Sequence, residues 1–222
     1  MIKGNLTDSP LYEERFKFKE GKSDFTFLIV LLCLVLCFFG VSFYFTQTHE
    51  AVCVKGNSMN QTLNSGDWLL MKKGKAQRGD VIIVDVRSYP QFQGDTTHLI
   101  KRLIAVEGDK VKCVDGVVEI MYAGTSEWQT LNEPYAYYKD DKKNYDFAEY
   151  TVGEGEIFFL GDNRMNSMDS RYKENCSRID GLYSVNDIYG VVTQFAIDNQ
   201  DFLEFIFIPE HVKNATTVST KD

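Results

Sequence analysis

The sequence predicts a mainly β domain, barrel-like or a sandwich, preceded by one transmembrane helix. Two observations lead to this prediction. Near the start of the chain, residues 25–45 form a stretch without a charged side chain. The rest shows short runs rich in β-branched residues, separated by Gly, Asn and Asp, and no long stripe of helical period. About 175 residues follow the apolar stretch, enough for one substantial core.

The apolar stretch 25–45 reads FTFLIVLLCLVLCFFGVSFYF. As a helix it is long enough to cross the hydrocarbon core of a bilayer, which is about 30 Å thick. It is too long for the apolar core of a removable signal peptide, which holds about 7–15 residues, and no A-x-A cleavage pattern follows it. We therefore expect a retained anchor, the alternative being a very apolar helix buried in a core.

Basic residues flank this stretch unevenly. The first one after it is Lys55, whereas five precede it: Lys3, Arg15, Lys17, Lys19 and Lys22. Because Lys and Arg mark the cytoplasmic side of a span, we expect segment 1–24 in the cytoplasm and the chain from 46 onward outside it.

The outer domain is expected to cover residues 46–211, with the Tyr-rich stretch 122–152 as a surface insertion and 212–222 as a polar, disordered tail. Its turn residues lie between β-branched or apolar runs, as hairpins require. The predicted strands are 68–71, 80–86, 98–106, 110–114, 117–121, 156–160 and 189–197.

Charge and cysteine content exclude several classes of function. The formal net charge of −8 argues against a nucleic-acid surface. The five cysteines show no CxxC spacing, which argues against a zinc site or a thioredoxin-like motif. No metal or cofactor is expected. The sequence leaves open whether two of Cys53, Cys113 and Cys176 form a disulfide bond.

A serine segment follows the apolar stretch, running from Gly56 through Ser58 and Met59 to Leu63. A serine hydroxyl is a weak nucleophile and needs a base to take its proton. A candidate base is Lys101, within the strand predicted at 98–106. A buried lysine loses solvation, which disfavours its charged form and suits a general base. The alternatives are an ordinary turn serine and a lysine whose ammonium reaches water.

A third segment, GDNRMNSMDSR at 161–171, directly follows a predicted strand. Asp169 and Arg171 are spaced to pair, and Ser167 is able to give or accept a hydrogen bond. The density of polar groups indicates a functional loop, with a solvated surface loop as the alternative.

These three segments, in this order after an N-terminal anchor, resemble the motifs of bacterial type I signal peptidases. The first resembles G-x-S-M-x-P-T-L, and 101–109 resembles K-R-x-x-x-x-P-G-D. The third resembles G-D-N-R-x-x-S-x-D-S-R and matches every fixed position. Arg78-Gly79-Asp80 and Glu133-Pro134-Tyr135 resemble shorter family motifs. The resemblance covers roughly residues 25 to 195.

The resemblance implies a membrane-anchored serine endopeptidase that removes signal peptides from exported preproteins. Ser58 would be the nucleophile and Lys101 its general base, with the Ser58 backbone N–H stabilising the oxyanion. Small residues would be preferred one and three positions before the cut. The implied partners are secretory preproteins and the lipid bilayer, and the protein would act as a monomer.

The resemblance also implies a set of residues that shape the site. Ser167 would hydrogen-bond the lysine, Asp169 and Arg171 would form an ion pair, and three residues would form the rear wall: Asp162, Asn163 and Arg164. Gly56 stands where some members carry a hydroxyl that serves the oxyanion hole.

Two departures from the family pattern fall on proline positions, occupied here by Gln61 and Glu107. Losing a proline loosens a turn and costs on the order of 1 kcal/mol. Neither change removes a reacting group, so we expect an effect on efficiency rather than on mechanism.

Three alternatives compete with this interpretation. A soluble self-cleaving repressor with a Ser/Lys site conflicts with the anchor and the acidic charge. A non-catalytic or narrow-specificity assembly factor for pili or surface proteins remains the alternative function, although a non-catalytic relative is expected to lose Ser58 or Lys101. A histidine in place of the lysine is not supported, because His98 lies three residues out of register.

Overall fold

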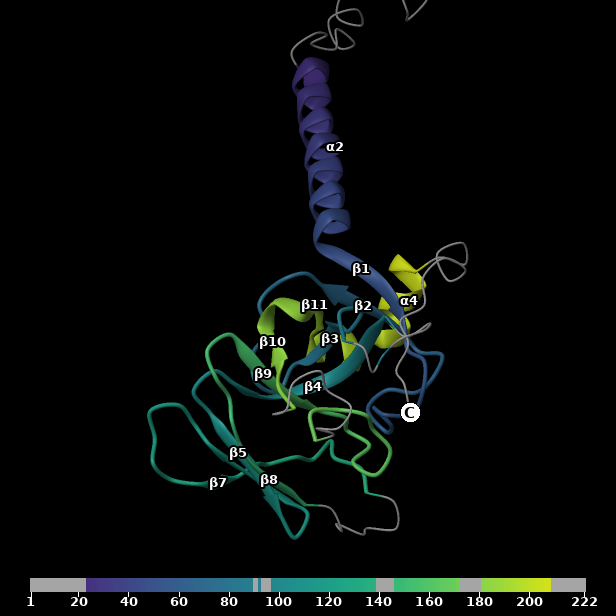
Figure 1. Ribbon diagram of the computed structural model, residues 1–222. Helices are drawn as coiled ribbons and strands as arrows, with labels where there is room; N and C mark the ends of the chain where they lie inside the picture. The colour runs from purple at the N-terminus through teal and green to yellow at the C-terminus, as the bar shows by residue number, and fades with distance from the viewer. Residues whose placement is uncertain (1–22, 90–91, 93–96, 139–145, 172–180, 209–222) are drawn as a thin grey trace, which may run out of the picture. The chain divides into compact units, whose positions relative to one another are not determined.

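The computed structural model describes residues 23–89, 92, 97–138, 146–171 and 181–208. The chain divides into two units, Met1–Thr48 and His49–Asp222 (Figure 1). Cys176, most of segment 1–24 and the tail 212–222 lie outside the described residues, as does part of the Tyr-rich stretch.

The first unit contains helix α2, Ser23–Thr48, which is three residues longer at its C-terminal end than the predicted stretch. The hydroxyls of Thr46 and Thr48 are accommodated in its last turn, where they donate to the carbonyls of Phe43 and Tyr44, each at 2.9 Å. Residues Phe25–Thr48 are long and apolar enough to cross a membrane, and their side chains are mostly exposed.

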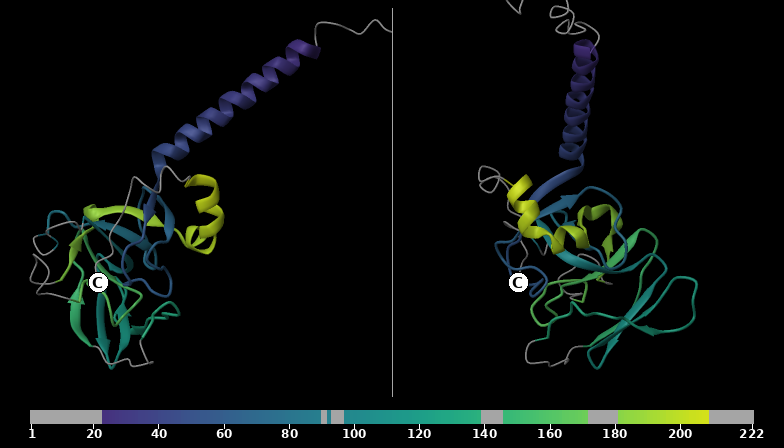
Figure 2. Two further views of the ribbon diagram at one scale, coloured as in Figure 1. Left: turned by 90° about the vertical axis from the view of Figure 1, so that its right-hand side faces the viewer. Right: turned by 180° about the vertical axis from the view of Figure 1, so that it is seen from behind.

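The second unit is built mainly from two antiparallel sheets, which confirms the predicted fold class (Figures 1 and 2). The larger sheet has the order β1-β2-β11-β3-β4-β9-β10. Its strands are β1 His49–Cys53, β2 Trp68–Lys72, β3 Val81–Asp85, β4 His98–Val106, β9 Glu156–Leu160, β10 Tyr183–Ser184 and β11 Ile188–Val192. The smaller sheet has the order β7-β6-β5-β8, with β5 Lys110–Val114, β6 Val117–Met121, β7 Gln129–Thr130 and β8 Phe147–Thr151.

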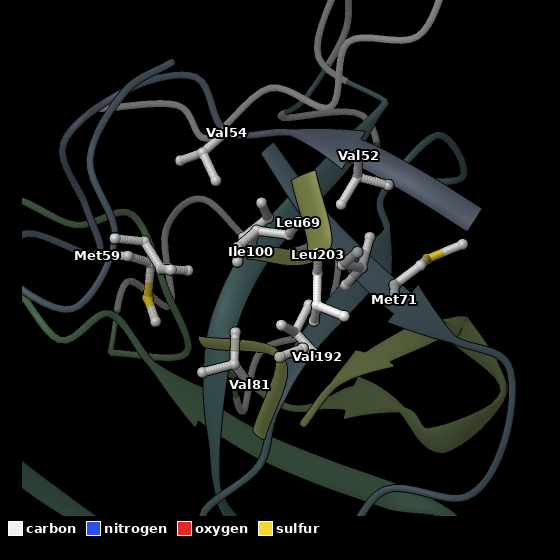
Figure 3. Packing of buried hydrophobic residues seen from close by; sticks show 12 residues of the cluster. Val52, Val54, Met59, Leu69, Met71, Val81, Ile100, Val192 and Leu203 are labelled. Carbon is white, nitrogen blue, oxygen red and sulfur yellow. The ribbon is translucent and has the colours of Figure 1, made fainter. Parts of the chain in front are cut away.

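Strand β4 is central to the larger sheet and is buried along seven of its nine residues. Ile100 belongs to one core cluster, whereas Leu99 and Leu103 belong to another. The first cluster combines residues of β1, β2, β3 and β11 with Met59 of the serine segment (Figure 3). The core therefore fixes both the strand that carries Lys101 and the segment that carries Ser58.

The strand predicted at 189–197 ends early, at Val192. Thr193 instead caps helix α3, Gln194–Asp198, and its hydroxyl accepts a hydrogen bond from the backbone N–H of Ala196 at 3.3 Å. Helix α4, Gln200–Phe207, follows directly. A short 3-10 turn, η4, covers Val185–Asp187 before β11.

The Tyr-rich stretch, predicted as a surface insertion, contributes strands to the smaller sheet. It contains β7 and β8, and β8 pairs with β5 in the smaller sheet. Tyr150 of β8 is buried against Phe147 and Phe158. Cys53 and Cys113 are both buried, and they lie in different core clusters.

Candidate active site

The serine segment lies between β1 and β2, and its apolar side chains attach it to the core. Met59 and Leu63 are fully buried in the first core cluster, which fixes the backbone on the C-terminal side of Ser58. On the other side, Gly56 has a φ of +96°, a conformation that favours glycine. Ser58 itself is fully buried.

Lys101 meets Ser58 inside the domain. Its Nζ lies 2.6 Å from Ser58 Oγ and 3.0 Å from the carbonyl oxygen of Ile100. Its side chain is fully buried, so the alternative in which the ammonium reaches water is wrong. Removal from water disfavours a charged ammonium, and the neutral amine is the form able to accept a proton from a hydroxyl.

The loop after β9 contacts the serine segment through its backbone and side chains. The backbone N–H of Asn163 donates to the carbonyl oxygen of Ser58, and Asn163 Nδ2 donates to that of Asn57, both at 3.0 Å. Thr62 Oγ1 donates to Asp162 Oδ2 at 2.6 Å. Asp162 and Asn163 therefore fix the segment on both sides of the serine.

A buried ion pair joins this loop to the strand of the lysine. Arg102 donates to the two carboxylate oxygens of Asp162 at 2.8 and 2.6 Å. The side chain of Arg102 is 4% exposed and that of Asp162 fully buried. The Arg102 guanidinium also lies 3.9 Å from the ring centroid of Tyr135. Strand β4, the loop after β9 and the serine segment thus form one connected polar network.

Asp169 and Arg171 pair as expected. Arg171 donates to the two carboxylate oxygens at 2.7 and 2.9 Å, and the backbone N–H of Gly161 donates to Asp169 Oδ2 at 2.9 Å. Burial by itself would raise the pKa of Asp169, but the charge of Arg171 and these hydrogen bonds outweigh it, so the pKa is lowered. Arg171 also donates to the carbonyl oxygen of Arg164 at 2.7 Å, a contact that links the end of the loop to its beginning.

Arg164 forms an ion pair with Glu133. Its guanidinium donates to the two carboxylate oxygens at 2.8 and 2.6 Å, and its Nε donates to the carbonyl oxygen of Gly161 at 3.0 Å. Tyr135 lies between this pair and Arg102, and burial, followed by the charge of Glu133, raises its pKa.

Ser167 differs from expectation. Its buried Oγ has no hydrogen-bond partner of standard geometry among the described residues, so the expected bond to Lys101 is not formed. The hydroxyl still contributes to the lowered pKa of Asp169. Ser167 packs against Gly161, where an added Cβ would come within 2.1 Å of Ser167 Oγ and 2.6 Å of the Ser58 carbonyl oxygen. Only glycine at 161 allows this approach.

Replacing Asp169 by asparagine should destabilise the protein at neutral pH, and less so as the pH falls. A carboxylate with a lowered folded pKa contributes stability above its unfolded pKa of about 3.9, and the contribution disappears as the pH falls through the folded value. Urea unfolding of the detergent-solubilised chain at pH 7 and at about pH 3 measures the difference between wild type and variant. A difference as large in acid as at neutral pH would contradict this assignment.

The family model described as "Signal peptidase, peptidase S26" matches residues 24–196. The chain belongs to this signal peptidase family. Signal peptidase I of Bacillus licheniformis is 35% identical over 150 residues, which cover 64% of this chain and 74% of the relative. Signal peptidase I of Bacillus amyloliquefaciens is 32% identical over 176 residues, which cover 73% and 75%. A crystal structure of a signal peptidase I from Enterococcus faecalis, 29% identical, covers 54% of this chain and 98% of its own, with a TM-score of 0.40.

In this signal peptidase, sequence reasoning missed how the polar network is connected. In the sequence, Arg102 and Thr62 stand out only as members of motifs, yet both contact Asp162. One signal was present: Arg102 lies within a strand of apolar residues, where a buried guanidinium needs an acidic partner. The partner lies 60 positions away in the chain, so the sequence could not identify it.

Proposed function

We propose that Ser58 and Lys101 carry out the removal of signal peptides by this member of the signal peptidase family. The observation that supports this proposal most is the distance of 2.6 Å between Lys101 Nζ and Ser58 Oγ, both fully buried. A nucleophile within hydrogen-bond reach of its base is the geometry that covalent serine catalysis requires.

The reaction would proceed in two halves. Neutral Lys101 takes the Ser58 proton as Oγ attacks the scissile carbonyl carbon, and the resulting ammonium then protonates the leaving amine of the mature protein. Lys101 next takes a proton from water as the water oxygen attacks the Ser58 ester. Collapse of the intermediate breaks the ester bond, Lys101 returns the proton to Ser58 Oγ, and the signal peptide leaves as a carboxylic acid. The Ser58 backbone N–H would stabilise the oxyanion in both halves. Gly56 offers no hydroxyl to that oxyanion.

The surrounding contacts would keep the dyad aligned. Asn163 fixes the Ser58 carbonyl, and Asp162 connects Thr62 to Arg102, the neighbour of Lys101. A side chain whose neighbours are hydrogen-bonded on both flanks loses little freedom on reaching the reactive geometry. Asp169, Arg171 and Arg164 would support the loop from behind rather than contact the substrate.

The finer features of substrate and topology are part of the same proposal. Small residues would be preferred one and three positions before the cut, as the family resemblance implies. The uneven distribution of Lys and Arg on the two sides of residues 25–45 supports an N-terminus in the cytoplasm and a peptidase domain outside it. The domain would act as a monomer at the bilayer. The alternative of a non-catalytic assembly factor gives no reason for a fully buried lysine in contact with a serine.

The proposal is tested by reconstituting the full chain in vesicles with a preprotein that carries a small-x-small site. The expected result is one cut directly after that site, identified from the N-terminal sequence of the product. Ser58→Ala is the inactive reference. A bulky residue one position before the cut should abolish the product. An intact, folded protein that leaves the preprotein uncut would overturn the proposal.

A further inference from the structure

The guanidinium of Arg102, the residue after Lys101, makes contacts in three directions. Its Nε and Nη2 donate to the carboxylate of Asp162, and its Nη1 donates to the carbonyl oxygen of Gly79 at 2.7 Å. The third contact is not a hydrogen bond, because the guanidinium carbon lies over the ring of Tyr135, 3.9 Å from its centroid. The Arg102 side chain is 4% exposed, so this ring is part of what separates the buried ion pair from water.

The Tyr135 ring acts on the ion pair in two ways. A cation over an aromatic face is attracted by the ring, more strongly where both groups are removed from water. Exclusion of water also strengthens the attraction between Arg102 and Asp162, because opposite charges interact more strongly at low dielectric constant. Asp162 in turn accepts a hydrogen bond from Thr62 of the serine segment at 2.6 Å. The contacts therefore run from the ring through the guanidinium and the carboxylate to the segment that carries the nucleophile.

Tyr135 is fixed in place by the residues on both sides of it. Glu133 forms its ion pair with Arg164, with side chains that are 7% and 0% exposed. On the other side, the backbone N–H of Tyr137 donates to the carbonyl oxygen of Asp162 at 2.7 Å, and the Tyr137 carbonyl oxygen accepts from the N–H of Arg164 at 3.0 Å. The ring is thus held over Arg102 by the same loop that contacts the serine segment.

We infer that Tyr135 is a positioning residue, which acts through Arg102 to keep Asp162 and the serine segment aligned for cleavage. The inference rests on the function proposed above, because its readout is cleavage by Ser58 and Lys101. Burial raises the pKa of Tyr135, so its phenol stays protonated near neutral pH. The ring rather than the hydroxyl is therefore the part of Tyr135 that acts.

Two substitutions separate the ring from the hydroxyl, measured on the full chain in vesicles with the preprotein. Tyr135→Leu removes the ring and should lower kcat about tenfold or more, because small displacements of a catalytic segment have large effects on rate. KM should stay unchanged, since Tyr135 acts through Arg102 and not on the substrate. Tyr135→Phe keeps the ring and should recover most of the rate. Urea unfolding gives the fraction of each variant that is folded, and rates are compared per folded molecule.

The chain offers a matched control in a second ion pair. Tyr122 lies over Arg78, 5.3 Å from the guanidinium carbon to the ring centroid, and Arg78 pairs with the fully buried Asp109. The contacts described for this pair do not include the serine segment. Tyr122→Leu makes the same chemical change at the same kind of contact, and it should leave kcat at the wild-type value.

A double variant tests the route through Arg102. Adding Tyr135→Leu to Arg102→Met should slow cleavage no further than Arg102→Met alone, because a residue that acts through a partner has no effect once that partner is gone. Losses that multiply in the double variant would overturn the inference. A Tyr135→Leu variant with the kcat of the wild type, a rise in KM alone, or a Tyr135→Phe variant as slow as Tyr135→Leu would overturn it too. In each of these cases the wild type still cleaves and Ser58→Ala does not, so the proposed function stands. A wild type no more active than Ser58→Ala would overturn the proposed function and this inference with it.

Discussion

Replacing Lys101 by methionine should lower the rate of signal-peptide cleavage about 10³-fold or more, with the protein still folded. The rate falls because Ser58 loses the amine that lies 2.6 Å from its Oγ and could take its proton, and a positioned general base contributes about 10²–10⁴-fold. Methionine has a similar length and no charge, so burying it should not destabilise the domain. Single-turnover cleavage of a preprotein in vesicles measures the loss.

The pH profile of the wild type provides an independent readout of the same role. A base must be unprotonated to act, so the rate should rise as the pH increases and level off once Lys101 is neutral. Ser58→Ala should be as inactive as Lys101→Met, and the double variant no worse than either, because the two groups act as a unit. Substantial residual cleavage by either variant, or a flat profile between pH 5 and 9, would refute the assignment.

Replacing Arg102 by methionine should destabilise the domain by about 3–5 kcal/mol, the usual cost of leaving one partner of a buried ion pair unpaired. Asp162 would keep a buried charge with Thr62 as a remaining side-chain donor. Because Asp162 also connects β4 to the serine segment, cleavage should slow as well. Urea unfolding of the detergent-solubilised chain measures the stability, and single-turnover kinetics measure the cleavage.

A double variant separates the cost of the unpaired charge from the loss of packing. Adding Asp162→Asn to Arg102→Met should restore part of the lost stability, since the uncompensated carboxylate is gone. The matched control is Lys110→Met, which removes one partner of the exposed pair with Glu149. The side chains of Lys110 and Glu149 are 42% and 44% exposed, so the expected loss of stability is below about 1 kcal/mol. Equal costs at the buried and the exposed pair would contradict the role given to Arg102.

The sequence by itself determined the class of fold, because period and composition are local properties. An uncharged stretch of membrane-spanning length predicted α2, and β-branched runs between turn residues predicted most of the strands. It erred at the ends of elements: α2 continues to Thr48, and Thr193 caps α3 inside a predicted strand. Three motifs in the order of the family resemblance selected Ser58 and Lys101 as the candidate catalytic pair.

Only the tertiary structure decided what those residues contact. Lys101 and Ser58 are 43 positions apart in the chain, and strand alternation could not say whether the lysine ends in water or against a hydroxyl. The sequence also could not show that Arg102 contacts Asp162. Nor could it show that Ser167 packs against Gly161 instead of forming a hydrogen bond with the lysine. The exposure of Phe202 and Phe205 on α4 also followed only from the fold, which buries Leu203 of the same helix. Distances between segments depend on sheet register and core packing, which involve the whole chain at once.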